Sequence, residues 1–256
     1  MDTGAKEFQL KLDWPIRQRI CLGIGKGLAF LHEESIIKVV HRDIKATNVL
    51  LDKDLNPKIS DFGLAKLDEE ENTHISTKVA GTIGYMAPEY ALWGYLTFKA
   101  DVYSFGIVAL EIVAGKSNMN YQSAENYVCL LDKALVLQPK EDFLELVDPR
   151  LGSNYNVEEA VRMIKVALLC TNPSPALRPT MSVVVSMLEG QMDIQETNVD
   201  SSIDNDELKF KALREKYDEL QSHYSETDSL VHASDVPYTS SSSHAKDLYP
   251  IDPYSQ

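Results

Sequence analysis

The chain has 256 residues, 44% of them hydrophobic, and a formal net charge of −14. This composition allows a folded core, while the acidic charge disfavours nucleic acids and anionic lipid as partners because their phosphates are repelled. Direct membrane insertion is not expected, since no apolar run approaches the roughly 18–20 residues of a membrane span and the longest is interrupted by Glu111.

Residues 14–34 are predicted to form a helix, because apolar side chains recur there at helical spacing. Asp13 is suited to cap this helix, and Pro15 is tolerated in a first turn. The run Gly23-Ile24-Gly25-Lys26-Gly27 superficially suggests a phosphate-binding loop. It lies inside the helical pattern without a preceding strand, which favours close helix packing as the reason for its glycines.

A short β-like stretch follows the first helix. Strands are expected at Val39–Val40, at Val49–Leu51 and near Ile59, with a turn over residues 52–57. Residues 63–86 are polar, and their hydroxyls and acidic run 68–71 predict an exposed loop.

The second half of the chain returns to helical patterns. A strongly apolar helix is predicted from Asp101 to about Ala114, closed by Gly115, and the last helix is expected to end at Gly190. Further helical patterns cover residues 124–137, 141–147, 157–171 and 179–189.

Residues 191–256 differ in composition from the rest of the chain. They carry 14 acidic and 5 basic residues and are rich in Ser, Thr and Asp. Only residues 206–220 show a weak amphipathic pattern, so we expect a disordered tail. Its hydroxyls could be phosphorylated and bound by partners, or the tail could be a solvated spacer.

The cysteines favour a reducing compartment. Cys21, Cys129 and Cys170 are odd in number, widely spaced and set in apolar surroundings. The N-terminus lacks the basic and then apolar pattern of a signal peptide. We therefore predict reduced core thiols and a cytoplasmic location.

Three motifs carry the chemistry. His41-Arg42-Asp43-Ile44-Lys45-Ala46-Thr47-Asn48 is followed by Asp61-Phe62-Gly63 and then by Ala87-Pro88-Glu89. In this order and spacing they resemble the catalytic loop, the metal-binding turn and the end of the activation segment of eukaryotic protein kinases. The resemblance covers about residues 10–190 and implies ATP and Mg²⁺ as cofactors and proteins as substrates.

The resemblance assigns the catalytic residues. Asp43 is expected to orient the attacking hydroxyl and accept its proton, since phosphoryl transfer needs mainly positioning and charge stabilisation. Asn48 and Asp61 are the expected Mg²⁺ ligands, because Mg²⁺ prefers hard oxygen donors. Lys45 is expected near the transferred phosphate, as in serine/threonine rather than tyrosine kinases, although a loop lysine can also be merely solvated.

Arg42 is expected to pair with a phosphorylated hydroxyl of the activation segment and so to order that segment. The candidate phosphoacceptors are Thr73, Ser76, Thr77 and Thr82, and the sequence does not choose among them. Thr82 could instead contact the substrate, because it follows Gly81 near the expected substrate-binding end.

Structural roles are expected for further motif residues. Glu89 and Arg178 should form a buried ion pair that ties the activation segment to the late helices. Asp101 could cap the apolar helix, brace the backbone of the catalytic loop as in the family, or do both. His41 should hold the loop by hydrogen bonds and packing, and Gly63 completes the metal-binding turn.

The resemblance can be narrowed to plant receptor-like serine/threonine kinases, with leucine-rich-repeat receptor kinases as the most similar type. The segments that carry it are Leu12-Asp13-Trp14, the run 81–90, and the runs 99–106 and 111–116. It implies a parent protein at the plasma membrane whose kinase part faces the cytosol.

The expected fold is mainly α, a kinase-like large lobe with short strands around the catalytic loop. The predicted domains are a remnant of the inter-lobe segment at residues 1–12, the large lobe at 13–190 and the tail at 191–256. The small β-rich lobe, with its glycine-rich loop and strand lysine, is expected to be absent. We therefore predict that the chain alone is inactive or nearly so. The alternative is a non-catalytic docking fragment that binds full-length receptor kinases or their substrates.

Overall fold

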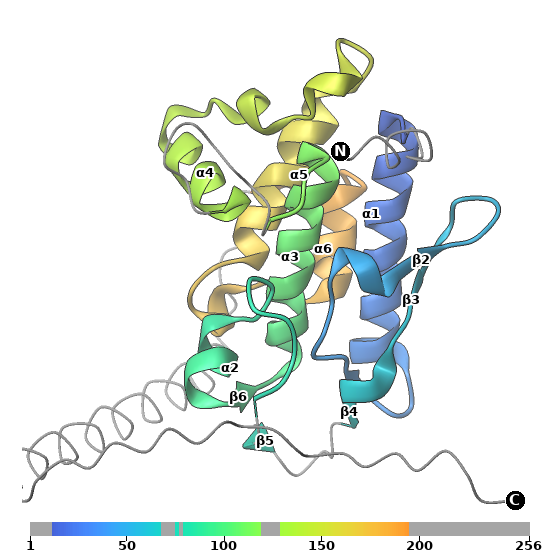
Figure 1. The fold of residues 1–256 in the computed structure, drawn as a ribbon, viewed down its shortest axis with the longest axis vertical. Helices are drawn as coiled ribbons and strands as arrows, with labels where there is room; N and C mark the ends of the chain where they lie inside the picture. The colour runs from blue at the N-terminus through green and yellow to red at the C-terminus, as the bar shows by residue number, and fades with distance from the viewer. Residues whose placement is uncertain (1–11, 68–74, 77–78, 119–128, 195–256) are drawn as a thin grey trace, which may run out of the picture. The chain divides into compact units, whose positions relative to one another are not determined.

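The computed structural model describes residues 12–67, 75–76, 79–118 and 129–194. All of them lie in the first of the chain's two compact units, Met1–Arg214. Figure 1 shows a helical body, with short strands beside its first helix and near one end. The helices are α1 Trp14–Ala29, α2 Pro88–Trp93, α3 Phe98–Ala114, α4 Leu130–Leu137, α5 Val157–Cys170 and α6 Met181–Leu188. The strands are β1 Val39–Val40, β2 Val49–Leu51, β3 Pro57–Ile59, β4 Lys66–Leu67, β5 Ile75–Ser76 and β6 Tyr95–Leu96.

Helix α1 begins as predicted. The Asp13 side chain accepts a 3.1 Å hydrogen bond from the Ile16 backbone N–H, and Pro15 lies in the first turn. After Ala29 the chain continues as one π-helical turn over Phe30–Glu34, so the predicted helix 14–34 changes its winding in its last five residues. Residues 35–38 connect this turn to β1.

The glycines of α1 allow a strand to pack closely against the helix. A Cβ atom on Gly23 would lie 2.4 Å from Cγ of Pro57, and one on Gly27 would lie 3.0 Å from Cδ1 of Ile59. Both neighbours belong to β3, which contacts α1. Close packing therefore accounts for these glycines, as the sequence favoured over a phosphate-binding loop.

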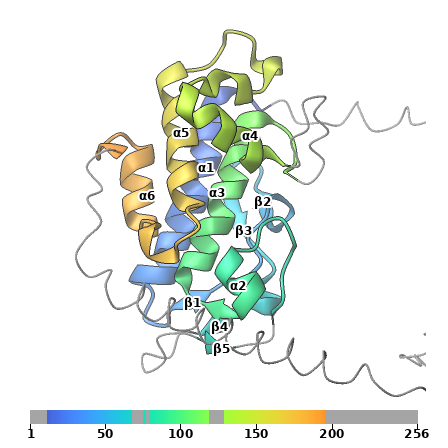
Figure 2. The ribbon, with the colours of Figure 1, turned by 90° about the vertical axis from the view of Figure 1, so that its left-hand side faces the viewer.

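Helix α3 forms the centre of the described fold. It packs against α1, α4 and α5, and α6 packs against α1 and α5 (Figures 1 and 2). It begins at Phe98 rather than at Asp101, because the Thr97 side chain accepts a hydrogen bond from the Lys99 N–H and caps the helix there. The prediction of Asp101 as the cap was therefore wrong. Gly115 ends the helix in a left-handed conformation with φ 59°, as expected.

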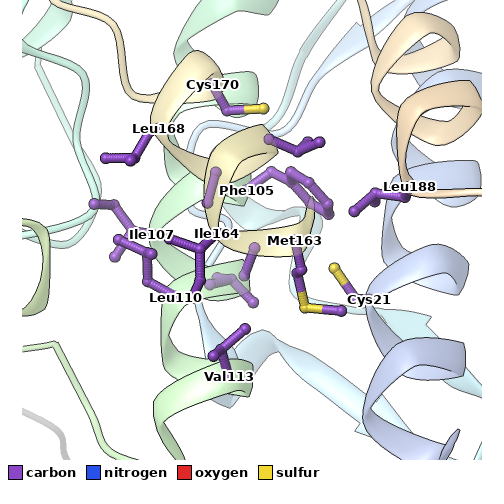
Figure 3. Close-up of a cluster of buried hydrophobic side chains, with 14 of the residues drawn as sticks. Cys21, Phe105, Ile107, Leu110, Val113, Met163, Ile164, Leu168, Cys170 and Leu188 are labelled. Carbon is purple, nitrogen blue, oxygen red and sulfur yellow. The ribbon is translucent and has the colours of Figure 1, made fainter. Parts of the chain in front are cut away.

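The core fills the space between α1, α3, α5 and α6. Figure 3 shows Phe105, Ile107 and Leu110 of α3 meeting Met163 and Ile164 of α5 in this cluster. Each of these side chains is at most 2% exposed, and most residues of α3 are buried, in keeping with its high apolar content. Cys21 and Cys170 lie in the same core as free thiols, and Cys129 is free and half-buried.

The short strands pair in three antiparallel ladders. β1 pairs with β4, β2 with β3, and β5 with β6. The β2–β3 hairpin confirms the strands predicted at 49–51 and near Ile59 and the turn between them. The 63–86 stretch is not wholly loop as predicted, because β4 and β5 lie within it and find partners in β1 and β6, far away in sequence.

Two other predicted helices differ in the structure. The pattern at 124–137 forms a helix only over Leu130–Leu137, and residues 119–128 lie outside the described part. Residues 143–146 form a single 3-10 turn instead of the helix predicted at 141–147, which shows that a short apolar pattern does not by itself sustain a helix. Residues 195–256 of the tail, which was predicted to be disordered, and the acidic run 68–71 also lie outside the described residues.

Candidate functional site

Asp101 of α3 accepts hydrogen bonds from the backbone of the 41–48 loop. Its Oδ2 accepts a 2.7 Å hydrogen bond from the His41 backbone N–H, and its Oδ1 accepts a 2.8 Å bond from that of Arg42. His32 Nε2 lies 3.0 Å from Oδ2. Asp101 is fully buried, and its bonds hold Arg42 at φ 73°, a left-handed conformation that costs a non-glycine residue energy. Asp101 therefore braces the loop backbone, the second of the two roles considered for it.

His41 connects this loop to the Asp61 turn. Its Nε2 lies 3.0 Å from the Ser60 carbonyl oxygen, and its Nδ1 accepts a 3.3 Å bond from the Asp43 backbone N–H. The ring also packs edge-on against Phe62, at 4.8 Å between ring centres. These contacts correspond to a neutral imidazole that carries its proton on Nε2, and they give His41 a structural role.

Asp43 lies where three polar side chains meet. Its Oδ2 accepts hydrogen bonds from Lys45 Nζ at 2.8 Å and from Asn48 Nδ2 at 3.2 Å. Its Oδ1 accepts a 2.7 Å bond from the Thr82 hydroxyl. Burial alone would raise the pKa of Asp43, but the hydrogen bonds from Lys45, Thr82 and Asn48 and the positive charge of Lys45 outweigh it and lower that pKa from its usual value. These contacts favour the ionised carboxylate, which is the form that can accept a proton.

Lys45 bridges the loop and the segment that follows it in sequence. Its ammonium donates to Asp43 and, at 2.9 Å, to the Thr82 hydroxyl. It is therefore bound within the site rather than merely solvated. Its positive charge lies beside the carboxylate, where it can offset negative charge on a group that approaches Asp43.

Asn48 and Asp61 are brought close together by the β2–β3 hairpin. The backbone N–H and the hydroxyl of Ser60 both donate to the Asn48 carbonyl oxygen at 2.9 Å, so Asp61 follows directly on a residue bonded to Asn48. The Asn48 amide nitrogen donates to the Asp43 backbone carbonyl at 2.9 Å, which leaves the amide oxygen as a potential ligand. Asp61 is exposed, has φ 65° and accepts from the Gly63 N–H.

These two oxygen donors suit a hard divalent cation. Across the ranges that the structure describes, no group of three or more His, Cys, Asp or Glu side chains could enclose a metal ion. A cation at Asn48 and Asp61 would thus need oxygens from a phosphate or from water, which is how Mg²⁺ is commonly bound in proteins.

Arg42 contacts a residue that sequence reasoning missed. Its guanidinium donates to the Tyr90 hydroxyl from Nε at 3.0 Å and from Nη2 at 2.5 Å, and Nη1 donates to the Leu64 carbonyl at 3.1 Å. Of the proposed phosphoacceptors, Thr82 contacts Asp43 and Lys45, and Ser76 lies in β5. Thr73 and Thr77 lie outside the described residues. The pairing of Arg42 with a phosphorylated hydroxyl remains a prediction.

The predicted ion pair between Glu89 and Arg178 is present. Two parallel hydrogen bonds of 2.6 and 2.7 Å join the guanidinium to the carboxylate, and neither residue is more than 1% exposed. Arg178 also donates to the Lys99 carbonyl at 2.8 Å. The pair ties α2 to the stretch between α5 and α6, although the two residues lie 89 positions apart.

A second buried contact, which was not predicted, joins the segment before α2 to α3. The Tyr85 hydroxyl donates a 2.6 Å hydrogen bond to Oε1 of Glu111 in α3, and the Asn118 backbone N–H donates to the same oxygen at 2.7 Å. Burial raises the pKa of both Tyr85 and Glu111. The only sequence signal was the isolated glutamate within an apolar helix, which indicates a buried polar partner without naming it.

Comparison with known proteins places these features in a family. Residues 7–189 match the model of the protein kinase domain. The chain is 58% identical over 254 residues to a probable leucine-rich repeat receptor-like serine/threonine-protein kinase of Arabidopsis thaliana. That alignment covers 97% of the chain and 25% of the relative.

Two further Arabidopsis thaliana proteins show the same likeness. A probable LRR receptor-like serine/threonine-protein kinase is 66% identical over 82% of the chain and 21% of its own length. Cold-responsive protein kinase 1 is 55% identical over 75% of the chain and 49% of its own length. The chain spans about a quarter or less of the length of the receptor-like relatives. In the part of the chain that the structure describes, no helix has the length and apolarity to cross a bilayer.

Proposed function

The chain belongs to the protein kinase family, among the plant receptor-like serine/threonine kinases, and we propose that its 41–48 loop transfers the γ-phosphate of ATP to serine and threonine hydroxyls of proteins. The observation that carries this proposal is the environment of Asp43. A buried carboxylate held by Lys45, Thr82 and Asn48 has a fixed direction and a lowered pKa.

Asp43 is suited to act on an alcohol. Phosphoryl transfer requires that the attacking hydroxyl be aimed at the phosphate and give up its proton as the new bond forms. The Thr82 hydroxyl already donates to Oδ1 of Asp43, which supports the ability of this carboxylate to accept from an aliphatic hydroxyl. A serine or threonine of a substrate would make the same kind of hydrogen bond.

Asn48 and Asp61 are the proposed holders of Mg²⁺ through their side-chain oxygens. Bound Mg²⁺ and ATP supply the reactive phosphate and the neutralisation of its charge. The protein contributes position, because Asn48 is bonded to Asp43 and, through Ser60, lies next to the Asp61 turn. Leu50, two residues after Asn48, is 57% exposed and offers an apolar surface to a purine ring.

The proposal is tested with the natural protein, [γ-³²P]ATP and three otherwise identical peptides that carry a single Ser, Thr or Tyr. We expect label on the Ser and Thr peptides, dependent on Mg²⁺, because Lys45, the residue that the resemblance associates with serine/threonine kinases, borders the carboxylate. Label on the Tyr peptide alone, or on none of the three, would refute the proposed reaction.

A second part of the proposal concerns the 256 residues by themselves. We infer that they transfer phosphate weakly or not at all without a glycine-rich lobe to clamp the nucleotide, since positioning accounts for most of this catalysis. The apolar side chain of Leu50, which is 57% exposed beside Asn48, is available for contact with such a lobe. The alternative function is docking onto full-length receptor kinases or their substrates.

Thermal unfolding with and without Mg²⁺–ATP distinguishes these possibilities. A ligand at 100 times its dissociation constant stabilises a folded site by about 2.7 kcal/mol. An upward shift that is lost in Asp61→Ala would show that these residues hold nucleotide alone. A cooperative transition without a shift is the expected result.

The names of the similar proteins describe receptor-like kinases. By analogy with them, we also propose that the parent protein is a membrane receptor and that the residues described above lie on its cytosolic side.

A further inference from the structure

Tyr90 joins two parts of the site through one hydroxyl group. The residue lies in α2 and is 1% exposed. Its phenol oxygen accepts hydrogen bonds from Arg42 Nε at 3.0 Å, from Arg42 Nη2 at 2.5 Å and from the Ala80 backbone N–H at 2.9 Å. In return it donates to the Ala80 carbonyl oxygen at 3.0 Å. The hydroxyl thus bonds both backbone polar groups of Ala80 and one side chain of the catalytic loop.

Arg42 is held firmly enough to serve as the fixed point of this arrangement. Its backbone N–H is bonded to Asp101, its Nη1 donates to the Leu64 carbonyl, and its guanidinium lies 5.5 Å from the centre of the Tyr90 ring. Leu64 follows the Asp61 turn closely, while Ala80 precedes the residues that reach Asp43. Arg42 and Tyr90 together therefore connect the two sides of the activation segment to the catalytic loop.

The position of Ala80 determines what reaches Asp43. The next residue, Gly81, has φ 133°, and a Cβ atom there would lie 2.7 Å from the Arg42 carbonyl oxygen. The chain consequently passes against the backbone of the loop at this point. One residue later, the Thr82 hydroxyl donates to Asp43. A shift of Ala80 would move Thr82 away from the carboxylate.

We propose that Tyr90 is a positioning residue, which holds Ala80 on Arg42 and so places the substrate-binding end of the activation segment at Asp43. This inference rests on the phosphotransfer function proposed above. An arginine in this place can be ordered by a phosphorylated hydroxyl through charge-assisted bonds. The phenol of Tyr90 in α2 adds a further acceptor for the same arginine and also bonds Ala80, and the buried Glu89–Arg178 pair fixes the same helix.

The first test compares Tyr90→Phe with Tyr103→Phe in the natural protein after phosphatase treatment. Tyr103 is a matched control, because its ring faces Arg178 at 5.0 Å and phenylalanine keeps that ring. Loss of a hydrogen bond to a charged group corresponds to about a tenfold effect. We expect about tenfold faster hydrogen exchange at the Ala80 amide and a similar rise in the peptide KM for Tyr90→Phe only. Unchanged Ala80 exchange in a folded Tyr90→Phe protein would overturn the proposal.

A second variant tests the contact from its other side. Arg42→Lys keeps the charge but not the two-point contact with Tyr90, and it leaves α2 unaltered. The peptide KM should rise in this variant too, and the effect of the double variant should be smaller than the sum of the two single effects, because both changes remove the contact between Arg42 and Tyr90. Full additivity of the two effects would contradict the proposed contact.

If no variant and no wild-type preparation transfers phosphate, the proposed function fails, while the Ala80 exchange measurement still decides the role of Tyr90.

Discussion

The hydroxyl of Thr82 donates a 2.7 Å hydrogen bond to Oδ1 of Asp43, although the two residues are 39 positions apart in sequence. Lys45 closes the arrangement by donating to both. The carboxylate is therefore in contact with the activation segment, and its chemistry depends on the placement of that segment.

Thr82→Ala should reduce kcat/KM for a peptide by about 10- to 100-fold, the equivalent of one hydrogen bond to a charged group. It should also raise the pKa of Asp43, since the Thr82 hydroxyl is one of the bonds that lower it. The acidic limb of the pH–rate profile would then move to higher pH. Thr82→Ser keeps the hydroxyl and serves as the control, and equal losses in both variants would contradict the role of the hydrogen bond.

Breaking the Glu89–Arg178 pair should be among the more damaging changes to the fold. Glu89→Gln leaves a fully buried guanidinium without its carboxylate, and we expect a loss of about 3–5 kcal/mol in the free energy of unfolding. Lys26→Met breaks a surface pair with Glu189 and should cost less than about 1 kcal/mol. Urea denaturation measures both, and similar losses in the two variants would show that the buried pair adds no special stability.

A charged network caps the C-terminus of α3. Asp148 accepts hydrogen bonds from Arg17 at 2.6 Å and from Arg150 Nε at 3.0 Å. Arg17 also donates to the carbonyl of Ile112 in α3 at 3.0 Å. Arg150 donates to the carbonyl of Gly115, the glycine that ends α3, at 2.8 Å. Burial opposes the charge of Asp148, but the bonds from Arg150 and Arg17 outweigh it and lower the pKa from 3.8 to about 2.

The stability of the fold should therefore depend on Asp148 in acid. A carboxyl with a lowered pKa in the folded state stabilises the fold above its unfolded pKa, and it loses that contribution as the pH falls through the folded pKa. We expect about 2 kcal/mol to disappear between about pH 4 and pH 2. Asp148→Asn should flatten that part of the stability profile, whereas Asp54→Asn, at an exposed turn residue, should leave it unchanged. Identical slopes for wild type and Asp148→Asn would contradict this assignment.

Gly23→Ala tests the packing explanation of the α1 glycines. The new Cβ would meet Pro57 at 2.4 Å, so we expect a loss of about 1–3 kcal/mol from overpacking. The affinity for Mg²⁺–ATP of the natural protein should remain unchanged. A stable variant with weakened nucleotide binding would instead support the phosphate-loop interpretation of the 23–27 run.

The sequence predicted the helices that carry a long, regular apolar pattern. The start of α1 at Asp13 and the end of α3 at Gly115 followed from local capping chemistry. The start of α3 was misplaced by three residues, because Asp101 resembles a cap and Thr97 is the actual one. The side chain of Asp101 is instead used across the fold, by the backbone of the 41–48 loop.

What the sequence could not provide were contacts that depend on distant parts of the chain. The strand β5 exists because β6 pairs with it, and neither segment has a strong pattern of its own. Tyr90 reads as an ordinary buried residue beside Ala87-Pro88-Glu89, and only the structure shows its hydroxyl on Arg42 and Ala80. The Glu89–Arg178 pair was predicted from the resemblance to protein kinases, because the spacing of the two residues in the sequence does not by itself indicate that they are in contact.

The most direct test of the central claim is the rate of γ-phosphate transfer to a serine peptide by natural protein carrying Asp43→Asn. Removal of a positioned general base typically lowers the rate by about 10²- to 10⁴-fold, and we predict a loss in this range with an unchanged unfolding temperature. Asparagine preserves the size of the side chain, so the loop and its contact with Thr82 should persist. A transfer rate equal to that of the wild type would contradict the assignment of Asp43 as the catalytic base.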